Sequence, residues 1–228
     1  PDFLLVVDFG YFIPTWLLKL PKIAPLNIHP SELPKWRGSS PGQFSILFND
    51  KKSAVTLMMI NNKFDQGPII HQDFFDVDAN WTQTDYYSHA FELMCNNLGE
   101  KIAKFAKSFD DAKPQPEKSP TITARMLKKD DAFVAWEVIK TAINGDKLQN
   151  ESRTTGSSDS KSDSLPQLSK LLLTALEHNQ SLSLTLERAS KAFNPWPGLW
   201  TKIPTIKGEK RMKLLELELE EKKLVLKT

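Results

Sequence analysis

The sequence predicts an α/β domain followed by a smaller domain that ends in β structure. The first prediction rests on short apolar strand candidates that alternate with helix candidates over the first 110 residues, a pattern typical of a mainly parallel sheet. The second rests on the strict alternation of leucine and glutamate over 215–220, which is typical of a half-buried antiparallel strand. A chain of 228 residues is long enough for one large domain or for a medium domain with a smaller partner.

The first domain contains four strand candidates. Leu4–Val7 is continuously apolar, which predicts a strand buried on both faces, and a helix-compatible stretch follows it. Pro41 suits the first turn of a helix that reaches about residue 49. Over 82–109, apolar residues recur every three to five positions, which predicts one long amphipathic helix or two in succession. The remaining strand candidates are 25–29, 53–60 and 69–75.

The composition changes after residue 110. Three prolines within eight residues predict a linker over 111–120, which separates a first domain at 1–110 from a second at 121–228. Within the second domain, residues 150–164 include no hydrophobic side chain, so we expect a disordered insertion there. A helix is expected over about 183–193, ahead of the final β structure.

The composition also excludes several classes of protein. Thirty Lys and Arg residues against 28 Asp and Glu residues give a net charge of only +2, so global basicity does not drive the function. Cys95 is the single cysteine, which excludes an internal disulfide and a CxxC redox site. No apolar run approaches the roughly 20 residues of a membrane span, so we expect no membrane partner.

One hydrolase-like motif is present and is rejected. Residues 38–42 match the Gly-x-Ser-x-Gly pattern, which would make Ser40 a nucleophile. The residue after such a serine must donate its backbone N–H to the oxyanion hole, and Pro41 has none. We therefore do not predict a serine hydrolase.

A better candidate site combines an amide, an imidazole and a carboxylate. Asn27 and His29 are two residues apart on a predicted strand, so their side chains project from the same face. The next strand leads into a loop that carries Asp65, and strand ends are where open α/β sheets bind ligands. Asn stabilises an oxyanion, His moves a proton and Asp orients the imidazole, as acyl transfer requires. The alternative is that these polar groups satisfy the local backbone.

Three segments resemble known formyltransferases. Residues 27–41, NIHPSELPKWRGSSP, resemble the Asn-x-His and Ser-Leu-Leu-Pro-Arg-x-Arg-Gly signature of folate-dependent formyltransferases, with Glu32 where that signature usually has Leu. Residues 63–69, KFDQGPI, are similar to the loop that carries the catalytic aspartate of that family. Residues 192–197, AFNPWP, resemble a segment typical of methionyl-tRNA formyltransferases.

This resemblance implies a Rossmann-like formyltransferase domain, then a linker and a partial C-terminal β-rich domain of the OB-like barrel type. Both domains are expected to be incomplete, as in a chain truncated at both ends. The implied reaction transfers a formyl group from 10-formyltetrahydrofolate to the α-amine of initiator methionyl-tRNA, without a metal. Asn27 and protonated His29 would stabilise the oxyanion, and Asp65 would favour the imidazolium.

The resemblance also implies binding residues and a location. The pterin of the folate would be held by the loop before the aspartate, namely Asn61, Asn62, Lys63 and Phe64. Candidate tRNA contacts are Lys35, Arg37, Lys207, Lys210, Arg211 and Lys213, although a solvated surface or an ion pair explains them about as well. Lys35 and Arg37 could also contact the folate. A monomer in the mitochondrial matrix is expected. The alternatives are a formyltransferase or hydrolase that uses a small amine or water, and an inactive RNA-binding remnant.

Overall fold

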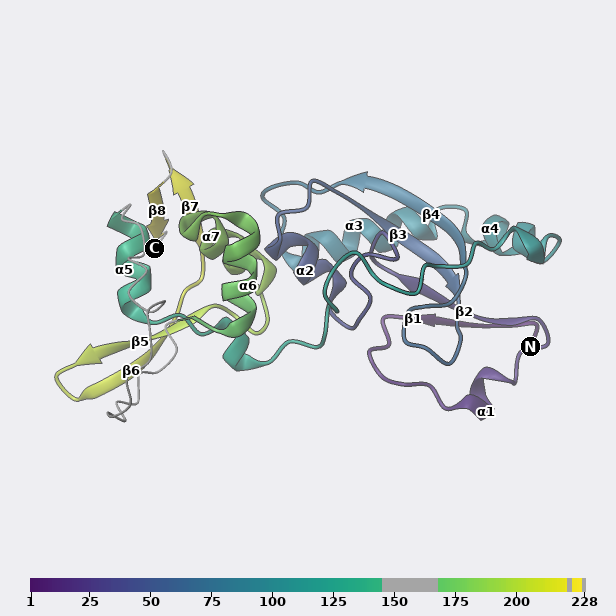
Figure 1. Cartoon of the computed structure of the whole chain (residues 1–228), viewed down its shortest axis with the longest axis horizontal. Coiled ribbons are helices and arrows are strands. Elements are labelled where there is room, and N and C mark those ends of the chain that lie inside the picture. The colour runs from purple at the N-terminus through teal and green to yellow at the C-terminus, as the bar shows by residue number, and fades with distance from the viewer. Residues whose placement is uncertain (145–167, 221–222, 227–228) are drawn as a thin grey trace. The chain divides into compact units, whose positions relative to one another are not determined.

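The computed structural model describes residues 1–144, 168–220 and 223–226 (Figure 1). The chain divides into two compact units, Pro1–Leu127 and Lys128–Thr228. The disordered insertion predicted over 150–164 lies outside the described residues. Within the described part of the chain, no helix combines the length and the apolar character that crossing a membrane requires.

The first unit is built on a mixed sheet of four strands in the order β1-β2-β3-β4. The strands β1 and β2 are parallel, whereas β3 is antiparallel to both β2 and β4. The α/β class is confirmed, but the prediction of a mainly parallel sheet is corrected by these pairings. A parallel crossover needs about a dozen residues or more, and the loop between β3 and β4 is shorter than that. The strands are β1 (Phe3–Val7), β2 (Ala24–His29), β3 (Lys52–Met59) and β4 (Ile69–Asp76).

The core of this unit lies between the sheet and the helix α3 (Gln83–Cys95), which packs on β3 and β4. Tyr86, Ala90 and Met94 of α3 are fully buried, as is most of β3. By contrast, Leu5 and Val7 of β1 are exposed, so the prediction of a strand buried on both faces is wrong. The reason is that β1 lies at the sheet edge, away from the strands that α3 covers.

The remaining helices of the first unit follow the sequence pattern with one interruption. The helix predicted over 82–109 is two helices in succession, α3 and α4 (Leu98–Phe105). Asn97, between them, has a φ of 62°, a left-handed conformation that an α-helix cannot contain. The helix expected from Pro41 is α2 (Pro41–Leu47), and α1 (Thr15–Leu18) is a single turn.

The predicted linker is instead a part of the first unit. We call residues 113–124 the strap. Lys113 exchanges both backbone hydrogen bonds with Ile69, and Ala124 bonds to the backbone of Arg37 and Ser40 at 2.8 and 2.9 Å. The boundary between the units therefore falls between Leu127 and Lys128, later than predicted. Polar side chains and backbone groups fix the strap in place, which the high proline content did not reveal.

The described part of the second unit contains helices and two separate antiparallel ladders. The expected final β structure is present as β5 paired with β6 and β7 paired with β8, and these pairs do not join into one barrel sheet within the described residues. The helix expected over 183–193 is α7. The elements are α5 (Trp136–Asn144), α6 (Lys170–Asn179), α7 (Leu182–Ala192), β5 (Trp200–Thr205), β6 (Gly208–Lys213), β7 (Leu217–Glu220) and β8 (Lys223–Leu226).

Candidate active site

The end of β2 supplies the amide and the imidazole of the site. Asn27 and His29 lie two residues apart on this strand, as predicted, and Ile28 points the opposite way into the core. The His29 side chain is buried, whereas Asn27 is half-buried and lines two pockets. The alternation of the strand therefore delivers two polar side chains to one side of the sheet.

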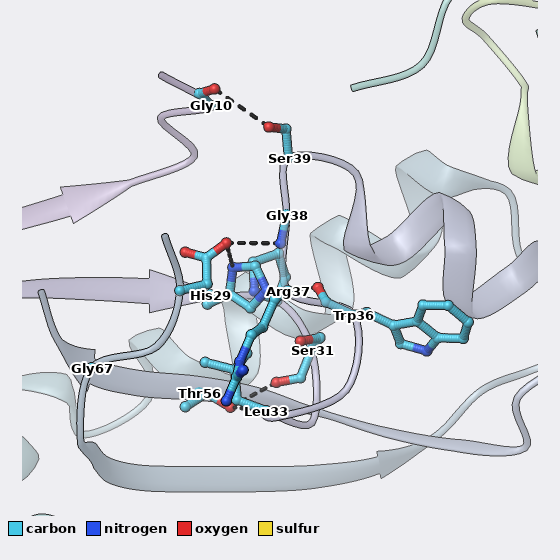
Figure 2. Close-up of polar contacts among 12 residues, drawn as sticks. Gly10, His29, Ser31, Leu33, Trp36, Arg37, Gly38, Ser39, Thr56 and Gly67 are labelled. Atoms are coloured by element: carbon cyan, nitrogen blue, oxygen red, sulfur yellow. Dashed lines mark hydrogen bonds and ion pairs between the residues drawn. The ribbon is translucent and has the colours of Figure 1, made fainter. Parts of the chain in front are cut away.

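Asp65 reaches the same point from the loop between β3 and β4. Its Oδ2 atom accepts a hydrogen bond of 2.8 Å from the backbone N–H of Gly38 and lies 3.8 Å from Nδ1 of His29. Figure 2 shows the two dashed lines that reach one carboxylate oxygen from Gly38 and from the His29 ring. The separation from His29 is too long for a hydrogen bond but short enough for an ion pair when the imidazole is protonated. The structure thus brings together the three residues that the sequence singled out.

The hydrogen bonds of His29 fix the roles of its two ring nitrogens. Nε2 lies 3.1 Å from the backbone carbonyl oxygen of Trp36, which can only accept a hydrogen bond. Nε2 therefore carries a proton, and Nδ1 is the nitrogen that faces Asp65. Nδ1 is consequently the atom at which a proton can be taken up or released toward a substrate.

Gly38 is a site residue that the sequence analysis missed. Its φ of 130° is open to glycine and costly for other residues, and a Cβ at this position would lie 2.4 Å from the carbonyl oxygen of Ala124. Because no side chain intervenes, the Gly38 N–H can approach the Asp65 carboxylate. The sequence did contain a signal for this residue, because Gly38 stands at the final glycine of the formyltransferase signature.

Two pockets meet beside Asn27 and Asp65. The first has an empty volume of about 480 Å³ and is bordered by aromatic side chains that follow β1, including Phe9, Tyr11 and Phe12. The second has an empty volume of about 360 Å³ and is bordered by His29, Gly38 and other polar groups. Four residues border both pockets: Phe9, Asn27, Phe64 and Asp65. A ligand in either pocket would therefore lie beside Asn27 and Asp65.

The predicted pterin-binding loop borders the first pocket. Asn61, Lys63 and Phe64 line it, and the side-chain oxygen of Asn61 accepts a hydrogen bond of 2.9 Å from the Lys63 N–H. Asn62 is exposed and is not among the lining residues. The aromatic residues at 9, 11 and 12 were missed, although they follow a strand end, where α/β sheets bind ligands. Apolar walls with a few polar groups suit a flat heterocycle.

Arg37, a predicted tRNA contact, is held inside the first unit by contacts with the strap. The side chain is buried, and its guanidinium donates to Oε1 of Gln115 and to the carbonyl oxygens of Pro116 and Glu117 at 2.7–3.1 Å. Burial lowers the pKa of Arg37 below its usual value, and the nearby Asp65 charge opposes that shift. The burial of Arg37 could not be predicted from the sequence, because the strap that contacts it is far away along the chain.

The other polar residues of this loop have local roles. Lys35 forms a partly buried ion pair of 3.0 Å with Glu32, the alternative that its sequence position left open. Trp36 is buried against Phe44 and Phe48, so it anchors the loop by packing. Ser40 is buried at the start of α2, directly before Pro41, and the objection to a nucleophilic serine stands.

The four tRNA candidates of the second unit lie on one exposed hairpin, β5–β6. Arg211 and Lys213 share a face of this hairpin, whereas Lys210 points from the opposite face. The Arg211 guanidinium lies 4.2 Å above the Trp200 ring, a cation–π contact that holds it in place. Lys207 is in the turn between the strands. The four basic residues therefore lie on the same hairpin, but their side chains are divided between its two faces.

No metal centre is evident in the part of the chain that the structure describes, where no three His, Cys, Asp or Glu side chains gather as ligands would. The site residues instead present an amide, an imidazole, a carboxylate and a backbone N–H. These groups can donate hydrogen bonds and move protons. They are suited to acyl-type transfer between two bound molecules.

Comparisons with known proteins agree with this chemistry. Residues 1–98 match the formyl transferase family. The methionyl-tRNA formyltransferase of Lactobacillus gasseri is 33% identical over 150 residues, which is 66% of this chain and 46% of that protein. The chain spans about half the length of the curated relatives that it matches.

Solved structures share the fold. HypX from Aquifex aeolicus in complex with tetrahydrofolic acid matches with a TM-score of 0.63 and 18% identity, over 97% of this chain and 30% of that chain. Methionyl-tRNA formyltransferase from Clostridium thermocellum matches with a TM-score of 0.59 and 14% identity, over 100% of this chain and 76% of that chain. Residues 1–98 thus carry a domain of the formyl transferase family, in a chain whose curated relatives are methionyl-tRNA formyltransferases.

Proposed function

We propose that the protein transfers a formyl group from 10-formyltetrahydrofolate to the α-amine of initiator methionyl-tRNA. The observation that carries this proposal is the meeting of two pockets at Asn27 and Asp65, with His29 on the border of the second. A transferase with two substrates needs two binding sites that converge on one set of catalytic groups. The match to the formyl transferase family supplies the group that is transferred.

In the proposed reaction, the folate lies in the aromatic pocket beside Phe64, and the amine enters from the polar pocket. The amine attacks the formyl carbon, a C–N bond forms, and the formyl oxygen becomes an oxyanion. The Asn27 amide donates a hydrogen bond to that oxyanion. When the C–N bond to the folate breaks, a proton from Nδ1 of His29 neutralises the departing nitrogen.

Asp65 completes the site in two ways. Its carboxylate pairs with the protonated ring of His29, and it can accept the proton that the attacking amine loses, directly or through water. The Gly38 N–H holds the carboxylate in position for both tasks. No step of this sequence requires a metal.

Comparison of acceptors tests the proposal. The full-length protein, given 10-formyltetrahydrofolate, is expected to formylate methionyl-tRNA with a kcat/KM at least about a hundredfold higher than for free methionine or another small amine, because the rest of the tRNA supplies binding energy. Mass spectrometry of the acceptor measures the product, and release of tetrahydrofolate without acceptor measures hydrolysis. A small amine or water as the preferred acceptor would reject tRNA, and no turnover with any acceptor would indicate an inactive remnant.

The β5–β6 hairpin is proposed as a tRNA contact. Replacing Arg211 and Lys213 together by glutamine is expected to raise the KM for tRNA several-fold and to flatten its dependence on KCl concentration, since each lost phosphate contact removes about 0.7–0.9 from the salt slope. Lys210→Gln, on the other face, is the matched control and is expected to change the slope less. Equal slopes for parent and double variant would exclude this face of the hairpin.

We also propose that the protein is a monomer and acts in the mitochondrial matrix. The matrix is proposed because, in a eukaryotic cell, it is the compartment where translation starts with formylmethionine. The methionyl-tRNA formyltransferase relative named above is bacterial. Light scattering of the purified protein and imaging of the tagged full-length protein test these two points.

A further inference from the structure

We infer that Gln115, in the strap, is a positioning residue for the proposed catalytic aspartate. The strap passes over the loop that contains Arg37 and the loop that contains Asp65, and the Gln115 side chain contacts both. This inference rests on the proposed function insofar as Asp65 acts in catalysis. The contacts themselves lie within the first unit and do not depend on that proposal.

The amide group of Gln115 is fully satisfied by these contacts. Its Nε2 donates to the backbone carbonyl oxygens of Asp65 and Gly67, at 3.0 and 2.8 Å. Its Oε1 accepts from Nε and Nη2 of Arg37, at 3.1 and 2.9 Å. Because carbonyls only accept and a guanidinium only donates, this arrangement fixes which end of the amide faces which loop. A carboxylate or an ammonium could satisfy only one side.

The loop that receives these hydrogen bonds is tightly constrained. Asp65 has a φ of 51°, in the left-handed region that non-glycine residues occupy at a cost. Gly67 is buried, and a Cβ there would lie 1.8 Å from the carbonyl oxygen of Met59. The two carbonyl groups that flank this bend are those that Gln115 holds. The hydrogen bonds therefore stabilise the backbone conformation that aims the Asp65 carboxylate.

The other end of the network anchors Gln115 to the loop after His29. Arg37 is buried and also donates to the carbonyl oxygens of Pro116 and Glu117, the residues that follow Gln115. Gly38, the next residue, donates its N–H to Oδ2 of Asp65. Arg37 and Gln115 thus link the two loops behind the point where His29 and Asp65 face each other, and a shift of either loop would change that 3.8 Å separation.

Gln115→Glu separates positioning from general stability. The carboxylate keeps an acceptor for Arg37, but it cannot donate to the two carbonyl oxygens and repels them instead. In the full-length protein, kcat for formyl transfer is expected to fall at least tenfold with little change in the KM for either substrate. The exchange rate of the Gly38 amide proton, measured by NMR, is expected to rise at least tenfold, because its acceptor moves away. The Gly42 amide, which donates to Tyr87 elsewhere, serves as the internal control and should not change.

Ser119→Ala is the matched control for loosening of the strap. The Ser119 hydroxyl donates to the carbonyl oxygen of Pro34 at 2.8 Å, and its other hydrogen-bond partner is Thr121, so its hydrogen bonds do not go to the Asp65 loop. Its loss should therefore lower the melting temperature and leave kcat within twofold. If Gln115→Glu does not fold, Gln115→Met removes the same donors with a similar shape and takes its place. An inactive parent would refute the proposed function, and the Gly38 exchange rate would still decide the role of Gln115. Unchanged Gly38 exchange with unchanged kcat, or equal kcat losses in the Gln115 and Ser119 variants, would overturn the inference.

Discussion

His29→Ala is expected to lower kcat for formyl transfer by at least about a hundredfold, the scale of losing a general acid or base. The variant loses the Nδ1 atom that is proposed as the proton donor beside Asp65, while the pocket residues that are proposed to bind the folate keep their side chains. The KM for methionyl-tRNA should therefore change little. Initial rates over a range of tRNA and folate concentrations measure the two parameters separately.

A suitable control for this variant is His71→Ala. The Nε2 atom of His71 lies at hydrogen-bond distance, 2.9 Å, from Oδ1 of Asp73, and His71 does not line either pocket of the site, so its replacement should leave kcat within twofold. Because His29 is buried and its Nε2–H donates to the Trp36 carbonyl, the melting temperature of the variant must be measured as well. A folded His29→Ala protein with kcat within tenfold of the parent would reject the assigned proton transfer.

Asp65→Asn is expected to lower kcat by a similar factor of about a hundred, through loss of charge and not of shape. The amide oxygen of asparagine can still accept from the Gly38 N–H, so the loop should stay in place. The negative charge that pairs with protonated His29, and the acceptor for the amine proton, are lost. The protection of the Gly38 amide should remain, which distinguishes this variant from Gln115→Glu.

Asp76→Asn provides the comparison for removal of one surface carboxylate. Asp76 forms an exposed ion pair with Lys52 at the end of β4, away from the pockets, and such pairs contribute little. The kcat of the Asp76→Asn variant should equal that of the parent protein. If Asp65→Asn matched the parent too, the carboxylate would have no part in the chemistry, and another base would have to take the amine proton.

The sequence by itself determined the features that depend on short-range pattern. Alternation along a strand places Asn27 and His29 on one face, and this holds whatever surrounds the strand. The continuous apolar run of 53–60 located β3, because such a segment must be buried. The short loop after β3 kept Asp65 close to the strand ends, so its meeting with His29 could be predicted. The catalytic roles of these residues remain predictions.

The tertiary structure decided which residues surround the site. The strap reads as a proline-rich linker, and its contacts join residues nearly 80 positions apart, such as Arg37 and Gln115 at a separation of 78. The periodicity of apolar residues cannot predict such pairs, since each pair forms only after the core has brought the loops together. For the same reason the sequence predicted Arg37 as a tRNA contact, although its guanidinium is buried and donates to residues of the distant strap. The direction of strand pairing and the division of the β5–β6 basic residues between two faces were likewise fixed only when strands met their neighbours.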